Sequence, residues 1–232
     1  MIKGEEQHSR IMQSRRWWWV AVAVGVVCAG AWAYRHIDGA HSRTARRPIH
    51  RSTKVATELK ATQNSAIAVD TDSVTALKHG SQLTAVMLMA SWCLYCAYED
   101  KYVWPTVLTT PGFQLDLVDV SARGGIGVPG PQSPPFSGHD QVGATEDVLG
   151  TSRTMQEYLH QFGLTQANVS AYVAPSGWTI WHMSTYPTIV FLNRKGMVVE
   201  RVNGALTAKA MQNLVFTLDA IQAKQAGAHF AS

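Results

Sequence analysis

Two cysteines, Cys93 and Cys96, stand three residues apart and are the only close thiol pair in the chain. They follow an apolar run at residues 83–90, which predicts a strand buried on both faces. Residues 93–103 contain neither Gly nor Pro and predict a helix, so Cys93 would stand at the helix N-terminus, where unpaired amides and the helix dipole favour a thiolate. Cys96 would lie on the same face, able to attack a mixed disulfide at Cys93. The spacing therefore predicts a redox-active disulfide, with Cys93 as nucleophile and Cys96 as resolving thiol.

The same pair has two other interpretations, half of a zinc site and two buried apolar thiols. No second C-x-x-C or C-x-x-H motif is present to complete a tetrahedral site, so we expect no metal and no other cofactor. The third cysteine, Cys28, lies within an apolar segment and is expected to be a small apolar helix residue. With 46% hydrophobic residues the chain does not need disulfides as a scaffold.

The elements that must position the pair alternate between helix and strand. We expect helices at 70–79, 151–162 and 207–224, strands at 113–120 and 188–192, and a returning hairpin strand at 197–202. Between residues 123 and 143, ten of 21 residues are Gly or Pro. This composition predicts a long surface loop without regular structure, which is either a functional lid or disordered.

The formal charge of +4 is unevenly divided along the chain. Residues 1–60 carry 11 Lys and Arg against 4 Asp and Glu, a net +7, whereas residues 61–232 carry 9 against 12, a net −3. A nucleic-acid-binding domain needs a basic face on its folded part. We therefore expect no nucleic-acid partner.

The amino-terminal 66 residues divide into three segments. A basic segment at 1–16 ends in Arg15 and Arg16, and the uncharged run at 17–34 is just long enough to span a membrane. The same run resembles a signal peptide, because an A-x-A cleavage pattern stands at 31–33. A polar, basic linker follows at 35–66, and we expect it to be flexible. The folded domain would then occupy residues 67–232.

These segments predict a single-pass cell-membrane protein with its folded domain in the periplasm or otherwise outside the cytoplasm. The alternative is a cleaved signal peptide and a soluble periplasmic protein. Four Lys and Arg precede the run and six follow it within twenty residues, so the positive-inside rule does not favour an outside domain. We expect the domain outside the cytoplasm for a functional reason instead, because a membrane-tethered dithiol module with a signal-like start is most useful there.

The motif at 90–96 (ASWCLYC), followed at 186–188 by Tyr-Pro-Thr opening a strand, resembles the thioredoxin superfamily. The resemblance covers roughly residues 67–224 and implies an α/β thioredoxin-like fold, a central mixed sheet flanked by helices. It also implies that Pro187 is a cis proline facing the cysteines and that Tyr186 and Trp92 contact the substrate. The alternative for Pro187 is a proline at a strand edge.

Within the superfamily the sequence looks nearest to the C-terminal domain of membrane thiol:disulfide interchange proteins of the DsbD type. There the motif is followed by an acidic-Lys-Tyr triplet, which stands here at 100–102. Asp100 would tune the thiol pKa values or shuttle a proton; the alternative is a solvated charge beside Glu99. Many thioredoxins carry a buried carboxylate six residues before the first cysteine, but Met87 occupies that position, so this role is missing or relocated.

Together these patterns predict a thiol:disulfide oxidoreductase that acts on disulfides of exported proteins and exchanges electrons with a membrane partner. The direction is expected to be reduction, with oxidase or isomerase activity as the runner-up. Two other classes stay open: a binding or assembly module of an envelope complex, and a metal or haem-assembly chaperone. Three residues of the segment before Pro187 are expected either to border the site or to pack in the core: Trp178, Trp181 and His182.

Overall fold

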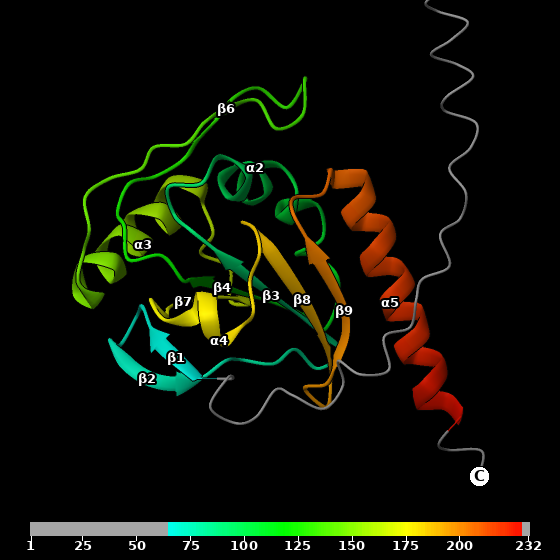
Figure 1. Ribbon diagram of the computed structural model, residues 1–232. Helices are drawn as coiled ribbons and strands as arrows, with labels where there is room; N and C mark the ends of the chain where they lie inside the picture. Colours follow the sequence, from blue (N-terminus) through cyan, green and yellow to red (C-terminus); the bar gives the residue numbers. More distant parts are fainter. Residues whose placement is uncertain (1–64, 229–232) are drawn as a thin grey trace, which may run out of the picture. The chain divides into compact units, whose positions relative to one another are not determined.

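A seven-stranded mixed sheet forms the centre of the computed structural model, which describes residues 65–228 (Figure 1). Its strand order is β2-β1-β7-β4-β3-β8-β9. The strands are β1 (Ser65–Ala68), β2 (Ser73–Ala76), β3 (Leu83–Met89), β4 (Phe113–Asp119), β7 (Val169–Val173), β8 (Thr188–Asn193) and β9 (Val198–Asn203). β3, β4 and β7 run parallel, whereas β8, β9, β1 and β2 join by antiparallel pairing.

Helices flank this sheet at α2 (Leu94–Tyr102), α3 (Val148–Phe162), α4 (Gly177–Ile180) and α5 (Ala208–Ala228), with a 3-10 turn, η3, at Trp104–Thr106. Asp147 caps the N-terminus of α3 through its side chain, which accepts from the amide of Gly150, and Gly163 caps the C-terminus in the left-handed conformation. The parallel β3-α2-β4-α3-β7 unit followed by the β8-β9 hairpin and α5 confirms the predicted thioredoxin-like α/β fold.

The alternation of side chains along β3 divides the core between two faces of the sheet. Met87 and Met89 point into a cluster that includes residues of α2, α3 and α5, whereas Val86 and Leu88 point into a second cluster around Trp181. All seven residues of β3 are buried, as expected of its apolar run. All seven residues of β4 are buried too, including its polar members.

The predicted helix at 70–79 is wrong, because β2 and its turns occupy that segment. The strand residues Ser73, Val74 and Thr75 are all exposed, and two of them are β-branched, which favours extended backbone. β2 pairs with β1, which begins at Ser65, two residues before the expected start of the domain at 67. The sequence interpretation also missed β7, a five-residue strand.

The predicted surface loop at 123–143 contains regular structure, contrary to expectation. Its two-residue strands β5 (Val128–Pro129) and β6 (Gly138–His139) pair antiparallel. The hydroxyl of Tyr98 donates to the Gln132 carbonyl at 3.0 Å and that of Tyr102 to the Gly130 carbonyl at 2.9 Å. The loop therefore packs on α2.

The predicted anchor or signal run at 17–34 lies outside the described residues. So do the basic segment at 1–16 and the predicted linker up to residue 64. Within residues 65–228, none of the helices has the length and apolar character needed to cross a bilayer.

Candidate active site

Cys93 occupies the last position before α2, and Cys96 lies in its first turn. Cys93 keeps an extended conformation, with its amide donating to the Ala90 carbonyl at 3.0 Å and its carbonyl accepting from the Ala97 amide at 3.0 Å. Both cysteines are free thiols; Cys93 is 3% exposed and Cys96 is fully buried. The structure thus places the two thiols at the helix N-terminus, as the spacing predicted.

The surroundings separate the acidities of the two thiols. A hydrogen bond from Cys96 lowers the pKa of Cys93, and the amides of Cys96 and Tyr95 act in the same direction against the effect of burial. Burial raises the pKa of Cys96 well above its ordinary value, and the hydrogen bond to Cys93 adds to this rise. Cys93 is therefore the thiol that ionises first, which suits a nucleophile, while Cys96 needs a proton acceptor before it can attack.

Pro187 stands beside the end of β3 that leads to the cysteines. The Tyr186–Pro187 peptide bond is cis, and the next residue, Thr188, pairs with Leu88 of β3. The resemblance implied this cis bond, and Pro187 lies directly before the first residue of β8.

The ring of Tyr186 contacts two tryptophans. Its centroid is 5.5 Å from the Trp92 ring and 5.0 Å from the Trp178 ring, both edge-on. Burial raises the pKa of Tyr186 to about 12, with contributions from the charges of Asp119 and the two cysteines. Trp92 and Tyr186 thus meet beside the dithiol, and the exposed Trp178 extends this aromatic surface. Trp181 instead packs in the core, and His182 is exposed.

Asp100 is fully buried on α2, so the alternative of a solvated charge is wrong. Its Oδ2 accepts a hydrogen bond from the hydroxyl of Tyr158 on α3. Burial raises the pKa of Asp100 to about 8, although the Tyr158 hydrogen bond opposes this rise. The charge of Asp100 in turn raises the pKa of Cys96. A carboxyl group of near-neutral pKa therefore interacts with the resolving thiol.

The neighbouring Glu99 is also buried, and its Oε1 accepts from the Leu206 amide at 2.6 Å. Burial raises its pKa well above the ordinary value. Among the described residues, Glu99 Oε2 and Asp100 Oδ1 are buried oxygens without a hydrogen-bond partner. Two buried carboxyl groups thus lie on α2, after the cysteines, whereas position 87 holds a methionine.

Asp119, at the end of β4, holds the segment that leads into the cysteines. Its carboxylate accepts from the amides of Ser91 at 3.0 Å and Ser121 at 2.8 Å. Burial raises its pKa to about 7 despite these hydrogen bonds. Asp119 thus holds the backbone of Ser91, two residues before Cys93, in place.

Four residues near the dithiol were not among the predicted site residues: Glu99, Asp119, Tyr158 and Asp140, whose Oδ1 accepts from the Leu94 amide. Tyr158 belongs to the apolar stripe of α3 and was indistinguishable from a core residue. Glu99 stands three positions after Cys96, a spacing that could have placed it near the thiols. The sequence does not indicate that Asp140 lies near the thiols, because no periodicity predicts where a residue of a long loop contacts a helix.

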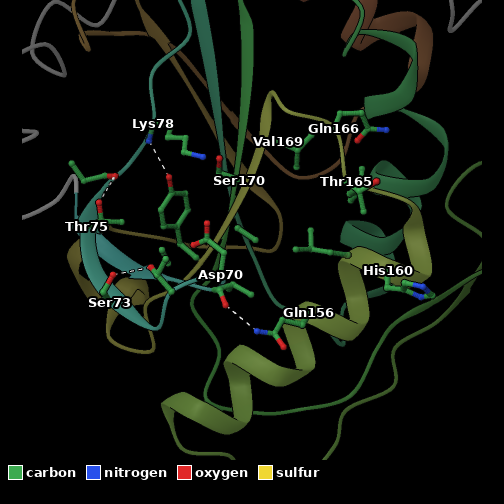
Figure 2. Close-up of a pocket in the computed structure, with 18 residues that line it drawn as sticks. Asp70, Ser73, Thr75, Lys78, Gln156, His160, Thr165, Gln166, Val169 and Ser170 are labelled. Carbon is green, nitrogen blue, oxygen red and sulfur yellow. Dashed lines mark hydrogen bonds between the residues drawn. The ribbon is translucent and has the colours of Figure 1, made fainter.

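No group of three or more His, Cys, Asp or Glu side chains within residues 65–228 is arranged to hold a metal ion. A separate pocket of about 620 Å³ lies between β1, β2, β7 and α3, and Figure 2 shows polar side chains around it, among them Lys78, Gln156 and His160. None of the residues assigned above to the dithiol site lines this pocket.

Comparison with solved structures finds many chains of related fold. A secreted disulfide oxidoreductase of Mycobacterium tuberculosis, homologous to Escherichia coli DsbE, aligns at 14% identity over 68% of this chain and 96% of its own, with a TM-score of 0.44. DsbF of M. tuberculosis aligns at 19% identity over 67% and 95%, with a TM-score of 0.45. StoA of Bacillus subtilis aligns at 16% identity over 66% and 92%, with a TM-score of 0.41. No family model and no curated protein matches the sequence.

Proposed function

We propose that this chain is a thiol:disulfide oxidoreductase that reduces disulfides of exported proteins. The observation that carries the proposal is the pair of free thiols at the N-terminus of α2, where the pKa of Cys93 is lowered and that of Cys96 is raised. This asymmetry supports different tasks for the two sulfurs. The aromatic surface of Trp92, Tyr186 and Trp178 lies beside them and offers apolar contacts to a substrate chain.

The reaction begins when the Cys93 thiolate attacks a substrate disulfide. A bond forms between Cys93 Sγ and one substrate sulfur, and the other substrate sulfur leaves as a thiolate that takes up a proton. Cys96, once deprotonated, attacks Cys93 Sγ and expels the second substrate sulfur as a thiolate, which also takes up a proton. The substrate has gained two electrons and two protons, and the protein carries the Cys93–Cys96 disulfide.

Asp100 is the proposed proton acceptor for Cys96. A group with a pKa near the working pH exchanges protons in both directions, and the pKa of Asp100 is raised to about 8. Its position four residues after Cys96 on the same helix supports this role. Tyr158 holds the carboxyl group in place through its hydrogen bond.

Return to the dithiol requires a two-electron donor, and we propose a dithiol protein of the membrane for this step. The run at 17–34 would tether the chain beside that donor, with the folded domain outside the cytoplasm. The alternative activities, oxidation and isomerisation, would use the same residues. They would differ in the reduction potential of the Cys93–Cys96 pair.

Two measurements on the full-length chain in detergent test the proposal. The Cys28→Ser chain should catalyse insulin reduction with a dithiol donor, and adding Cys93→Ser should abolish it. If the Cys28→Ser chain showed no turnover above that of the Cys93→Ser chain, the enzyme assignment would be lost and a binding module would be favoured. A reduction potential of the Cys93–Cys96 pair well above roughly −150 mV would favour assignment as an oxidase over assignment as a reductase.

A further inference from the structure

A carboxylate from the loop at 123–143 shares the N-terminus of α2 with the nucleophilic thiol. The amide of Leu94, the first residue of the helix, donates to Oδ1 of Asp140 at 2.8 Å. The next amides, those of Tyr95 and Cys96, lower the pKa of the Cys93 thiol. The unpaired amides of this helix end are thus divided between a carboxylate and a sulfur.

The loop that carries Asp140 is fixed to the cysteine segment on both sides of its hairpin. The Gly127 amide donates to the Ser91 carbonyl at 2.9 Å, and the Gln141 amide donates to the Trp92 carbonyl at 3.0 Å. A Cβ on Gly127 would lie 2.6 Å from the Cys93 carbonyl oxygen, so only glycine permits this approach. These backbone contacts fix the loop on either side of the Asp140 side chain.

The position of Asp140 has an electrostatic consequence for Cys93. A carboxylate is stabilised at a helix N-terminus, but a thiolate nearby competes for the same partial positive charge and is repelled by the carboxylate. Asp140 accordingly raises the pKa of Cys93 against the stronger lowering effects. Other titratable groups that interact with this thiol are Cys96, Glu99 and Asp100 of α2, Tyr158 of α3 and Tyr186 before β8.

We propose that Asp140 is a positioning residue that biases the dithiol toward reduction of its substrate, a role that rests on the function proposed above. By making the Cys93 thiolate less favourable, Asp140 destabilises the reduced protein relative to its disulfide. A less stable reduced form gives up its two electrons more readily. The converse is also known, because a dithiol protein whose reduced form is stabilised is a strong oxidant. Through Asp140, the loop at 123–143 thus sets the reactivity of the pair.

The test compares four full-length chains in detergent, all in the Cys28→Ser background: the parent, Asp140→Asn, Asp140→Ala and Glu157→Gln. Asn keeps an oxygen acceptor for the Leu94 amide and removes the charge, whereas Ala removes both. Glu157 is exposed on α3 and provides a control with the same change in net charge. Alkylation by iodoacetamide forms a Cys93 sulfur–carbon bond and expels iodide, so its rate, followed by mass spectrometry across pH, reports the Cys93 thiolate.

Both Asp140 variants should show an alkylation profile shifted to lower pH, with a rate roughly two- to fivefold higher below the midpoint. The shift should shrink in 1 M salt, because Asp140 is exposed and its charge is screened. Glutathione equilibration should give both variants a more positive reduction potential, and Glu157→Gln should match the parent. Profiles that coincide with the parent, or a shift seen only in Asp140→Ala, would overturn the proposal.

Alkylation does not depend on turnover, which separates the two proposals. If insulin reduction fails while the Asp140 variants shift the profile, the enzyme assignment falls and the electrostatic role stands. If insulin is reduced and the profiles coincide, only the role of Asp140 is lost.

Discussion

Tyr158 on α3 donates a hydrogen bond to Asp100 on α2, and both side chains are fully buried. This contact joins two helices beneath the resolving cysteine. It also stabilises the charged form of a carboxyl group whose pKa burial has raised to about 8. The proposed proton acceptor is therefore held in place and adjusted by the same phenol.

Replacing Asp100 by Asn should slow the resolving step. The amide keeps the size of the carboxyl group but cannot accept the Cys96 proton, so the mixed disulfide at Cys93 should accumulate. We expect a loss on the order of 100-fold in the rate of resolution, measured by quenched-flow trapping of the intermediate. Alkylation of Cys93 should persist. Glu99→Gln, a change at the adjacent buried carboxyl, is the matched control and should resolve faster than Asp100→Asn; equal rates for Asp100→Asn and the parent would exclude the proton-transfer role.

Tyr158→Phe should move the pH dependence of resolution to higher pH. Removing the phenol takes a hydrogen bond away from the ionised carboxylate, so the pKa of Asp100 should rise above about 8. The rate of resolution, plotted against pH, should show its midpoint displaced in the alkaline direction. A midpoint that stays in place, or moves toward acid, would show that Tyr158 only packs.

The free energy of unfolding should fall as the pH rises from 4 to 8. The pKa of Asp100 is near 3.9 in an unfolded chain and about 8 in the folded one, so the native state binds more protons within this window. The contribution is complete below the unfolded pKa and is lost as pH rises through the folded pKa, with a slope of up to about 1.4 kcal/mol per pH unit.

Denaturant unfolding at pH 5 and pH 8, followed by tryptophan fluorescence, measures this dependence. Asp100→Asn should reduce the slope. Asp116 and Asp119, whose pKa values burial raises to about 7, should leave a residual slope of the same sign. A slope that Asp100→Asn leaves unchanged would mean that the carboxyl is not a buried acid.

Gly127→Ala should displace the loop from the cysteine segment. The added Cβ would meet the Cys93 carbonyl oxygen at 2.6 Å and the Leu94 amide nitrogen at 3.0 Å, and backbone atoms cannot move aside cheaply. We expect a loss of roughly 1–3 kcal/mol in stability and faster proteolysis within 123–143. Gly163→Ala, at a helix end with open space around it but a left-handed backbone, controls for the loss of a glycine. Unchanged proteolysis would contradict the tight contact of the loop.

The parts of the fold that could be predicted are those with strong local patterns. Hydrophobic pattern predicts the apolar strand β3, the helix after Cys93, which contains no Gly or Pro, and α3 with its apolar stripe. The spacing of the cysteines predicts where the thiols lie. β2 was mistaken for a helix because its four residues are exposed and carry no alternating pattern. Asp140 reaches Leu94 across 46 residues, and Tyr158 reaches Asp100 across 58, so tertiary packing alone reveals these partners.

The central claim is that Cys93 attacks substrate and Cys96 resolves the product, and trapping tests it most directly. The full-length chain carrying Cys28→Ser and Cys96→Ala, mixed with a disulfide-bonded peptide, should form a covalent adduct that dithiothreitol releases and that mass spectrometry maps to Cys93. The matched Cys28→Ser, Cys93→Ala chain should form at least tenfold less adduct, because the pKa of its remaining buried thiol is raised. Equal adducts at either cysteine, or none at Cys93, would contradict the assignment.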